Sequence, residues 1–195
     1  MKHVQSKRLN HHFKIGVILL MLCCVMLAGC GQSAERDRLR EAVAGEWAYI
    51  HDPETTILKL GKNGKASYQG KSYKYTVDET YLTLNDGDEE LRLRYKKDGD
   101  EFYLYQPCDY TFSGEGDPDG LVGKWYDADT KWSYEFTADG TFREDGYFPG
   151  YYVNDPENGE IKLVYNDQFY DTTLYYTLDG EHLHIEYPWS MVKAQ

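Results

Sequence analysis

The residues with the clearest capacity for coordination chemistry lie near the C-terminus. His182, His184 and Glu186 alternate with Leu183 and Ile185. Residues two apart in a β-strand share a face, so two imidazoles and a carboxylate would point the same way. Imidazole nitrogens and carboxylate oxygens are ligands for zinc and related divalent metals. We therefore consider a metal site at these three residues, with a solvent-exposed strand face as the alternative.

A second candidate site is a run of aromatic residues around a Pro-Gly turn. Residues 147–152 read Tyr-Phe-Pro-Gly-Tyr-Tyr, and further aromatic residues follow. Exposed rings on a rigid β scaffold can stack on sugars or enclose an apolar ligand. The alternative is that these rings only fill a small core. The predicted ligand-binding residues are Tyr147, Phe148, Tyr151, Tyr152 and Tyr170.

Motifs for catalysis are absent from the sequence. There is no Gly-x-Ser-x-Gly elbow, His-Glu-x-x-His motif, phosphate loop or dinucleotide fingerprint. Acidic clusters at 86–90, 117–119 and 127–129 do not fit the twelve-residue calcium loop, and solvated turns are the favoured interpretation. The sequence therefore predicts a non-enzymatic protein without a cofactor.

The N-terminus has the three parts of a secretion signal. Residues 1–14 contain four Lys or Arg and no acidic residue. An uncharged apolar run follows at residues 15–29, and Cys30 comes directly after it. As a helix this run would span about 22 Å, short of a hydrocarbon core of about 30 Å. Leu27-Ala-Gly-Cys30 resembles the lipobox of bacterial lipoproteins, in which the cysteine receives a diacylglyceryl group before cleavage. The resemblance implies a signal peptide at 1–29 and a membrane anchor on Cys30, at the extracytoplasmic face.

Charge and cysteine content limit the partners of the predicted mature chain. The predicted signal peptide, residues 1–29, holds four of the 21 Lys and Arg and none of the 33 Asp and Glu. Residues 30–195 therefore carry a formal net charge of −16. Such a surface repels phosphate backbones, and no nucleic acid is expected as a partner. With Cys23 and Cys24 removed and Cys30 lipidated, Cys108 has no cysteine partner. We predict a buried or half-buried, unreactive thiol there.

From Gly45 onward the sequence has the period-two pattern of β-strands. Leu91, Leu93 and Tyr95 alternate with basic residues, for example, which is typical of a strand with one buried and one solvated face. Asn-Gly and Asp-Gly pairs separate such segments and favour hairpins. The predicted fold class is all-β, an antiparallel meander preceded by a short helix or tether at 30–43.

The meander occurs twice along the chain. Gly45-Glu-Trp47 matches Gly123-Lys-Trp125, Tyr73-Lys-Tyr75 matches Tyr151-Tyr-Val153, and the later segments follow in the same order. We predict β-meander repeats at 44–106 and 122–190, joined by a linker at 107–121. Each repeat is too short for a full eight-stranded cup, so we expect two partial barrels side by side, with one shared barrel as the alternative.

A polar or helical lead into Gly-x-Trp, followed by up-and-down strands with Asp-Gly hairpins, resembles the lipocalin-like domains of Gram-positive bacterial lipoproteins whose function is unassigned. The resemblance covers residues 35–187 and implies a fold and a binding role without naming a ligand. We expect a surface-anchored binding lipoprotein, for a small apolar ligand, a glycan or an envelope protein. The alternatives are a structural or protein-interaction lipoprotein of the envelope, without a pocket for small molecules, and a glycan or cell-wall hydrolase.

Overall fold

The secondary structure of the described residues is nearly all β. The computed structural model describes residues 33–114, 119–166 and 171–195, in which a helix at 33–43 precedes fourteen antiparallel strands. The predicted all-β meander with a short helical lead is therefore confirmed. The strands are β1 (Gly45–Tyr49), β2 (Thr56–Leu60), β3 (Lys65–Tyr68), β4 (Lys71–Val77), β5 (Tyr81–Asn85), β6 (Glu90–Asp98), β7 (Glu101–Phe112), β8 (Gly123–Tyr126), β9 (Ser133–Phe136), β10 (Thr141–Glu144), β11 (Phe148–Asp155), β12 (Glu160–Tyr165), β13 (Thr172–Asp179) and β14 (His182–Lys193).

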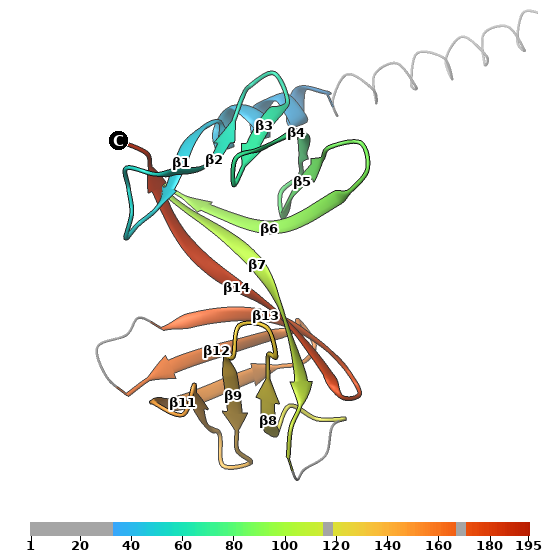
Figure 1. The fold of residues 1–195 in the computed structure, drawn as a ribbon, viewed down its shortest axis with the longest axis vertical. Coiled ribbons are helices and arrows are strands. Elements are labelled where there is room, and N and C mark those ends of the chain that lie inside the picture. The colour runs from blue at the N-terminus through green and yellow to red at the C-terminus, as the bar shows by residue number, and fades with distance from the viewer. Residues whose placement is uncertain (1–32, 115–118, 167–170) are drawn as a thin grey trace, which may run out of the picture.

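Strand pairing closes two rings that share two strands. Neighbouring strands pair in chain order from β1 to β14, and β14 pairs back with β1. β14 also pairs with β7, from His182 opposite Thr111 to Met191 opposite Phe102. This extra pairing makes one eight-stranded ring of β1–β7 with β14, and a second eight-stranded ring of β7–β14. Figure 1 shows them as two lobes joined by β7 and β14, which we call the first and the second lobe.

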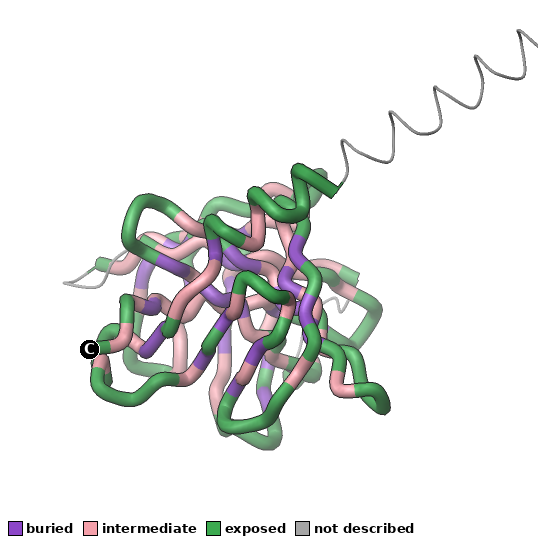
Figure 2. The backbone as a smooth tube through the Cα atoms, turned by 90° about the horizontal axis from the view of Figure 1, so that it is seen from above, coloured by how far each residue is buried: buried purple, intermediate pink, exposed green. Residues whose placement is uncertain are grey.

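Each lobe has its own hydrophobic core, and the two cores exchange residues through the shared strands. The core of the first lobe contains Trp47, Phe102 and Met191, the last from the end of β14. The core of the second lobe contains Trp125 and also Tyr110, from the end of β7. Buried and exposed stretches alternate along the chain, as the colours of the tube in Figure 2 show. Each repeat therefore supplies seven strands, and the eighth strand of its ring comes from the other repeat.

This exchange corrects the predicted linker. Residues 107–112, assigned to the linker at 107–121, form the second half of β7. We call residues 105–110 and 187–190 the waist, because there β7 and β14 pair with each other and with no third strand among the described residues. Pro107 and Pro188 both lie in the waist. Proline lacks a backbone N–H and is tolerated where one edge of a strand is free, so it does not end the strands here.

The two lobes have equivalent contacts at the base of each ring. The indole Nε1 of Trp47 donates to the carbonyl of Val43 at 2.9 Å, and that of Trp125 donates to the carbonyl of Leu121 at 2.8 Å. Gly45 and Gly123, two residues before each indole, have φ of 149° and 147°. This positive φ favours glycine, and a Cβ at either position would lie within 2.4 Å of a side chain that covers the indole. The Gly-x-Trp motif thus closes one end of each ring.

One alignment between the repeats differs from the prediction. The hydroxyl of Tyr75 donates to the carbonyl of Gly61 at 3.0 Å, and the hydroxyl of Tyr152 donates to that of Thr137 at 2.9 Å. Tyr152 therefore corresponds to Tyr75, where the sequence comparison had placed Val153. The repeats differ by one residue in this segment, which a comparison of short alternating patterns does not resolve.

A salt bridge beside the waist fixes the lobes relative to each other. Arg94 on β6 donates from Nε to Glu186 on β14 at 2.5 Å, and its guanidinium carbon lies 3.7 Å from the ring centroid of Tyr175 on β13. The side chains of Arg94 and Glu186 are 21% and 28% exposed, so this charge-assisted hydrogen bond is partly shielded from water. Arg94 thus links β6 of the first lobe to β13 and β14 of the second lobe.

Candidate functional site

The structure does not bring the predicted metal ligands together. His182 is exposed, His184 contacts Asp109 through Nδ1, and Glu186 is engaged by Arg94. The three share a face of β14, as the alternation predicted, but their side chains have different partners. In the ranges 33–114, 119–166 and 171–195, no group of three or more His, Cys, Asp or Glu is placed to hold a metal ion.

The predicted aromatic residues fall into separate environments. Tyr147 and Tyr151 are 82% and 53% exposed, whereas Tyr152 packs edge-to-face on Phe136 with ring centroids 5.0 Å apart. Tyr152 therefore fills the core of the second lobe, the alternative given for these rings. Phe148 is 38% exposed and lines the cleft described next. Tyr170 and Cys30 lie outside the described residues.

A cleft of about 460 Å³ lies between the lobes, beside the waist. One wall comes from the waist itself, and another comes from Ile50 and His51 of the first lobe. The second lobe supplies most of the remaining wall, including two adjacent carboxylates. The cleft is lined by Ile50, His51, Trp132, Glu144, Asp145, Phe148, Tyr165, Thr172, Tyr187, Pro188, Trp189 and Ser190. Only Phe148 among these was predicted as a ligand-binding residue.

Aromatic rings that line this cleft form a connected cluster around Trp189, which also contacts Tyr49 behind them. The Trp189 ring lies 5.4 Å from Tyr49, 5.9 Å from Tyr187 and 6.3 Å from Trp132, measured between centroids. The Tyr49 hydroxyl accepts a hydrogen bond of 2.7 Å from Gln106 on β7. Rings held by several neighbours are rigid, so they present fixed faces to a ligand at little cost in conformational entropy.

Glu144 is one of two half-buried acidic groups of the cleft, next to Asp145. Its Oε1 accepts from the Tyr134 hydroxyl at 2.8 Å and its Oε2 from the Tyr165 hydroxyl at 2.5 Å. Burial raises the pKa of the Glu144 carboxyl above its ordinary value; the two phenol hydrogen bonds oppose this rise, and the charge of Asp145 adds to it. The carboxylate is therefore oriented by donors that come from two different strands, β9 and β12.

The first lobe provides an internal comparison for Glu144. Glu144 pairs with Tyr134 across β9 and β10, and the equivalent pair in the first lobe is Tyr68 with Leu58. Tyr68 is 6% exposed and belongs to the first core. The second lobe therefore carries a carboxylate where its counterpart carries a core tyrosine. An ionisable carboxyl at a shielded position costs more stability than a tyrosine does, which points to a role in binding or chemistry.

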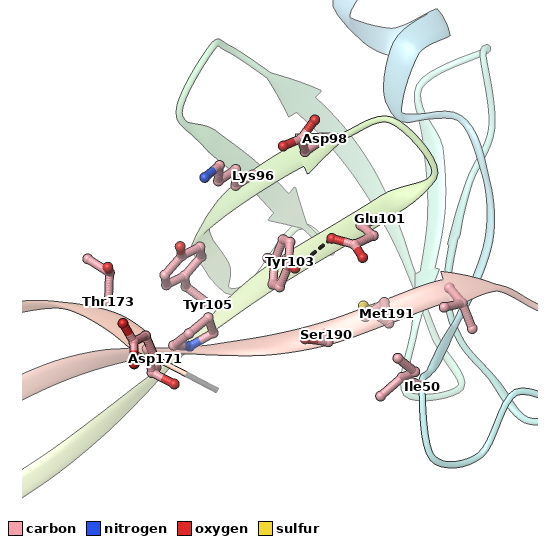
Figure 3. A pocket seen from close by; sticks show the side chains of 13 residues that line it. Ile50, Lys96, Asp98, Glu101, Tyr103, Tyr105, Asp171, Thr173, Ser190 and Met191 are labelled. Carbon is pink, nitrogen blue, oxygen red and sulfur yellow. Dashed lines mark hydrogen bonds between the residues drawn. The ribbon is translucent and has the colours of Figure 1, made fainter. Parts of the chain in front are cut away.

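A larger cavity of about 590 Å³ adjoins the cleft and shares Ile50, Thr172, Pro188 and Ser190 with it. Figure 3 shows its lining, in which Lys96 lies among the acidic residues Asp98, Glu101 and Asp171. The Tyr103 hydroxyl donates to Glu101 at 2.7 Å. Its charged lining has both signs and it lacks the tryptophans of the cleft, so it is a more polar hollow next to that site.

The sequence contained one signal for Glu144 that motif searches do not use. Glu144 is two residues from the buried Phe142, so the period-two pattern places it on the inward face of β10. A charged residue on an inward face is rare unless it has partners. The partners themselves, and the approach of Trp132 and Trp189 to the same cleft, depend on the pairing of distant strands.

Cys108 is free and half-buried, as predicted. Burial, and to a smaller extent the charges of Asp127 and Asp109, raise the pKa of its thiol to about 11.

In the described part of the chain no helix is long and apolar enough to cross a membrane. The chain matches no protein-family model, no curated protein and no solved structure.

Proposed function

We propose that this protein is a membrane-anchored lipoprotein of the extracytoplasmic face, whose folded part binds a ligand without catalysis. The proposed site is the cleft beside the waist. The observation that carries the proposal is the half-buried Glu144, held by Tyr134 and Tyr165 in an aromatic cleft, at a position where the other lobe has a core tyrosine.

The anchor is supported by the basic lead, the apolar run at 15–29 and the lipobox-like Leu27-Ala-Gly-Cys30. In cells grown with labelled palmitate, we expect the label on the wild-type protein and its loss in Cys30→Ala. Cys108→Ala is the matched control and should keep the label, because Cys108 lies half-buried in β7. Label that persists in Cys30→Ala would contradict the proposed attachment site.

Binding in the cleft is supported by the composition of its lining. Large rings give much contact area at low entropic cost, and a few polar groups fix orientation, which is the usual composition of small-molecule sites. The ligand classes expected from the sequence are a small apolar molecule, a glycan and an envelope protein. A cleft of this size accommodates a small molecule or one end of a chain.

Native mass spectrometry of residues 31–195 tests this proposal. We expect a saturable ligand, either co-purified or taken up from a cell-envelope extract, that Trp189→Ala no longer retains. Trp189→Ala removes the ring at the centre of the cleft cluster. Val153→Ala is the control, because Val153 is 58% exposed on β11 and does not line the cleft. Equal retention by both variants would place the ligand elsewhere.

A hydrolase is the second candidate, favoured by one observation. Glu144 has a raised pKa and stands beside Asp145 in the same cleft, and pairs of carboxylates carry out acid and base catalysis in glycosidases. Under this alternative, glycan or cell-wall substrates should be turned over, and Glu144→Gln should abolish turnover. Stoichiometric binding with no released product favours the binding role.

A further inference from the structure

The charges of the cleft indicate which chemical class of ligand it takes. Among the described residues that line it, the carboxylates are Glu144 and Asp145, and none is Lys or Arg. The predicted mature chain also carries a net charge of −16. A low-dielectric cleft strengthens the field of its own charges, so an anionic ligand is disfavoured and a cationic one is attracted.

The rings of the cleft add to this preference. The faces of Trp, Tyr and Phe carry a negative quadrupole and attract a cation within about 6 Å of the ring centroid. Trp132, Tyr187 and Trp189 contact one another through centroids 5.9 to 6.4 Å apart and all line the cleft. A cation that lies against this ring cluster on the side of the cleft would meet ring faces together with the carboxylates.

The hydrogen bonds on Glu144 favour an ammonium without strong donors. Both carboxylate oxygens already accept from phenol hydroxyls, Oε1 from Tyr134 and Oε2 from Tyr165. These two donors fix the orientation of the carboxylate, so it presents a negative charge at a defined place in the cleft. A methylated ammonium offers a diffuse positive charge and an apolar surface, which suits aromatic ring faces and a carboxylate whose orientation is already fixed.

We propose that the cleft beside the waist binds an organic cation, a methylated ammonium group on a small molecule, between the Trp132, Tyr187 and Trp189 rings and the carboxylate of Glu144. This inference rests on the proposed function, because it names the ligand class of the same cleft. In this arrangement the aromatic rings contact the methyl groups of the cation, and the carboxylate of Glu144 balances its positive charge.

Calorimetry with residues 31–195 tests the charge directly. The probes are choline and its neutral isostere 3,3-dimethyl-1-butanol, which differ in one positive charge at nearly equal shape. We expect choline to bind at least about tenfold more tightly, the difference that a cation–π contact in a partly desolvated site supplies. Glu144→Gln and Trp189→Ala should each weaken choline binding by about tenfold or more.

The matched control is Glu135→Gln, which removes a carboxylate from the exposed face of the neighbouring strand β9 and should leave choline binding unchanged. Circular dichroism of each variant shows that the fold is retained. Equal affinity of choline and the neutral isostere would overturn the inference and leave the binding role intact. Failure of both probes also overturns it, and the mass-spectrometric test then decides whether the cleft binds any ligand.

The pH dependence of choline affinity distinguishes a direct role of Glu144 in binding from a purely structural role. A cation favours the ionised carboxylate, so choline affinity should fall as pH is lowered through the pKa of Glu144, which lies above its ordinary value. The titratable groups that interact with this carboxyl are Tyr110, Tyr134, Tyr165, Tyr187 and Asp145. His51 lines the same cleft, so His51→Gln is titrated alongside. A pH profile unchanged in Glu144→Gln would contradict the assignment.

Discussion

A chain shortened to end at Tyr187 should lose the fold of the first lobe while the second lobe stays folded. The missing residues 188–195 are farthest along the chain from β1, yet they complete its ring. Met191 is 1% exposed in the first core, and β1 pairs with β14 through Tyr49 opposite Met191 and Trp47 opposite Lys193. Without these partners, β1 and β7 become open edges over an exposed core.

The size of this effect follows from the size of the lobe. A unit of about 60 residues buries only about 60% of the surface of its unfolded chain and is marginally stable. Loss of a buried Met alone costs about 2–5 kcal/mol, comparable with the total stability of such a unit. The second lobe keeps residues 182–186 of β14 and all of β7, so its ring remains closed.

Hydrogen exchange measured by mass spectrometry checks this prediction. Amides of β2–β5 should exchange rapidly in the shortened chain, and amides of β9–β13 should stay protected. A chain that ends at Lys193 is the control, because it keeps the whole of β14 and loses only Ala194 and Gln195. If β2–β5 were equally protected in both chains, the shared strand would not be what closes the first ring.

Replacing Trp125 by alanine should lower the free energy of unfolding of the second lobe by about 3–5 kcal/mol. The Trp125 side chain is fully buried, packs edge-to-face on Phe112 at 5.1 Å, and satisfies the carbonyl of Leu121. The substitution therefore creates a cavity and leaves a buried acceptor unpaired. Urea unfolding followed by circular dichroism measures the loss, and Trp47→Ala should produce the same loss in the first lobe.

The control for Trp125→Ala is Tyr147→Ala, which removes a ring that is 82% exposed in the same lobe. Surface substitutions of this kind change stability by no more than about 0.5 kcal/mol. Equal losses for the two variants would mean that the Gly-x-Trp motif does not close the ring. A large loss confined to Trp125 would give the repeated motif a structural role in both halves.

The sequence by itself determined the strands, the hairpins and the side of each strand that is buried. Alternation along Leu91, Leu93 and Tyr95 predicted β6, and the Asp98-Gly99 pair predicted the turn to β7. Both are local properties, because side chains of a strand alternate between faces and tight turns require backbone angles that glycine adopts readily. The two halves also follow one order because their local patterns are alike.

Only the tertiary structure decided which strands pair at the waist and which side chains meet in the cleft. The pattern of residues 107–112 does not show which strand they pair with, and the sequence therefore predicted a linker there. Their place in β7 depends on pairing with the distant strand β14. Glu144, Trp132 and Trp189 belong to three segments whose proximity depends on closing both rings. Ring closure is set by burying two cores at once, and that requirement acts between residues far apart in the chain, beyond the reach of any local pattern.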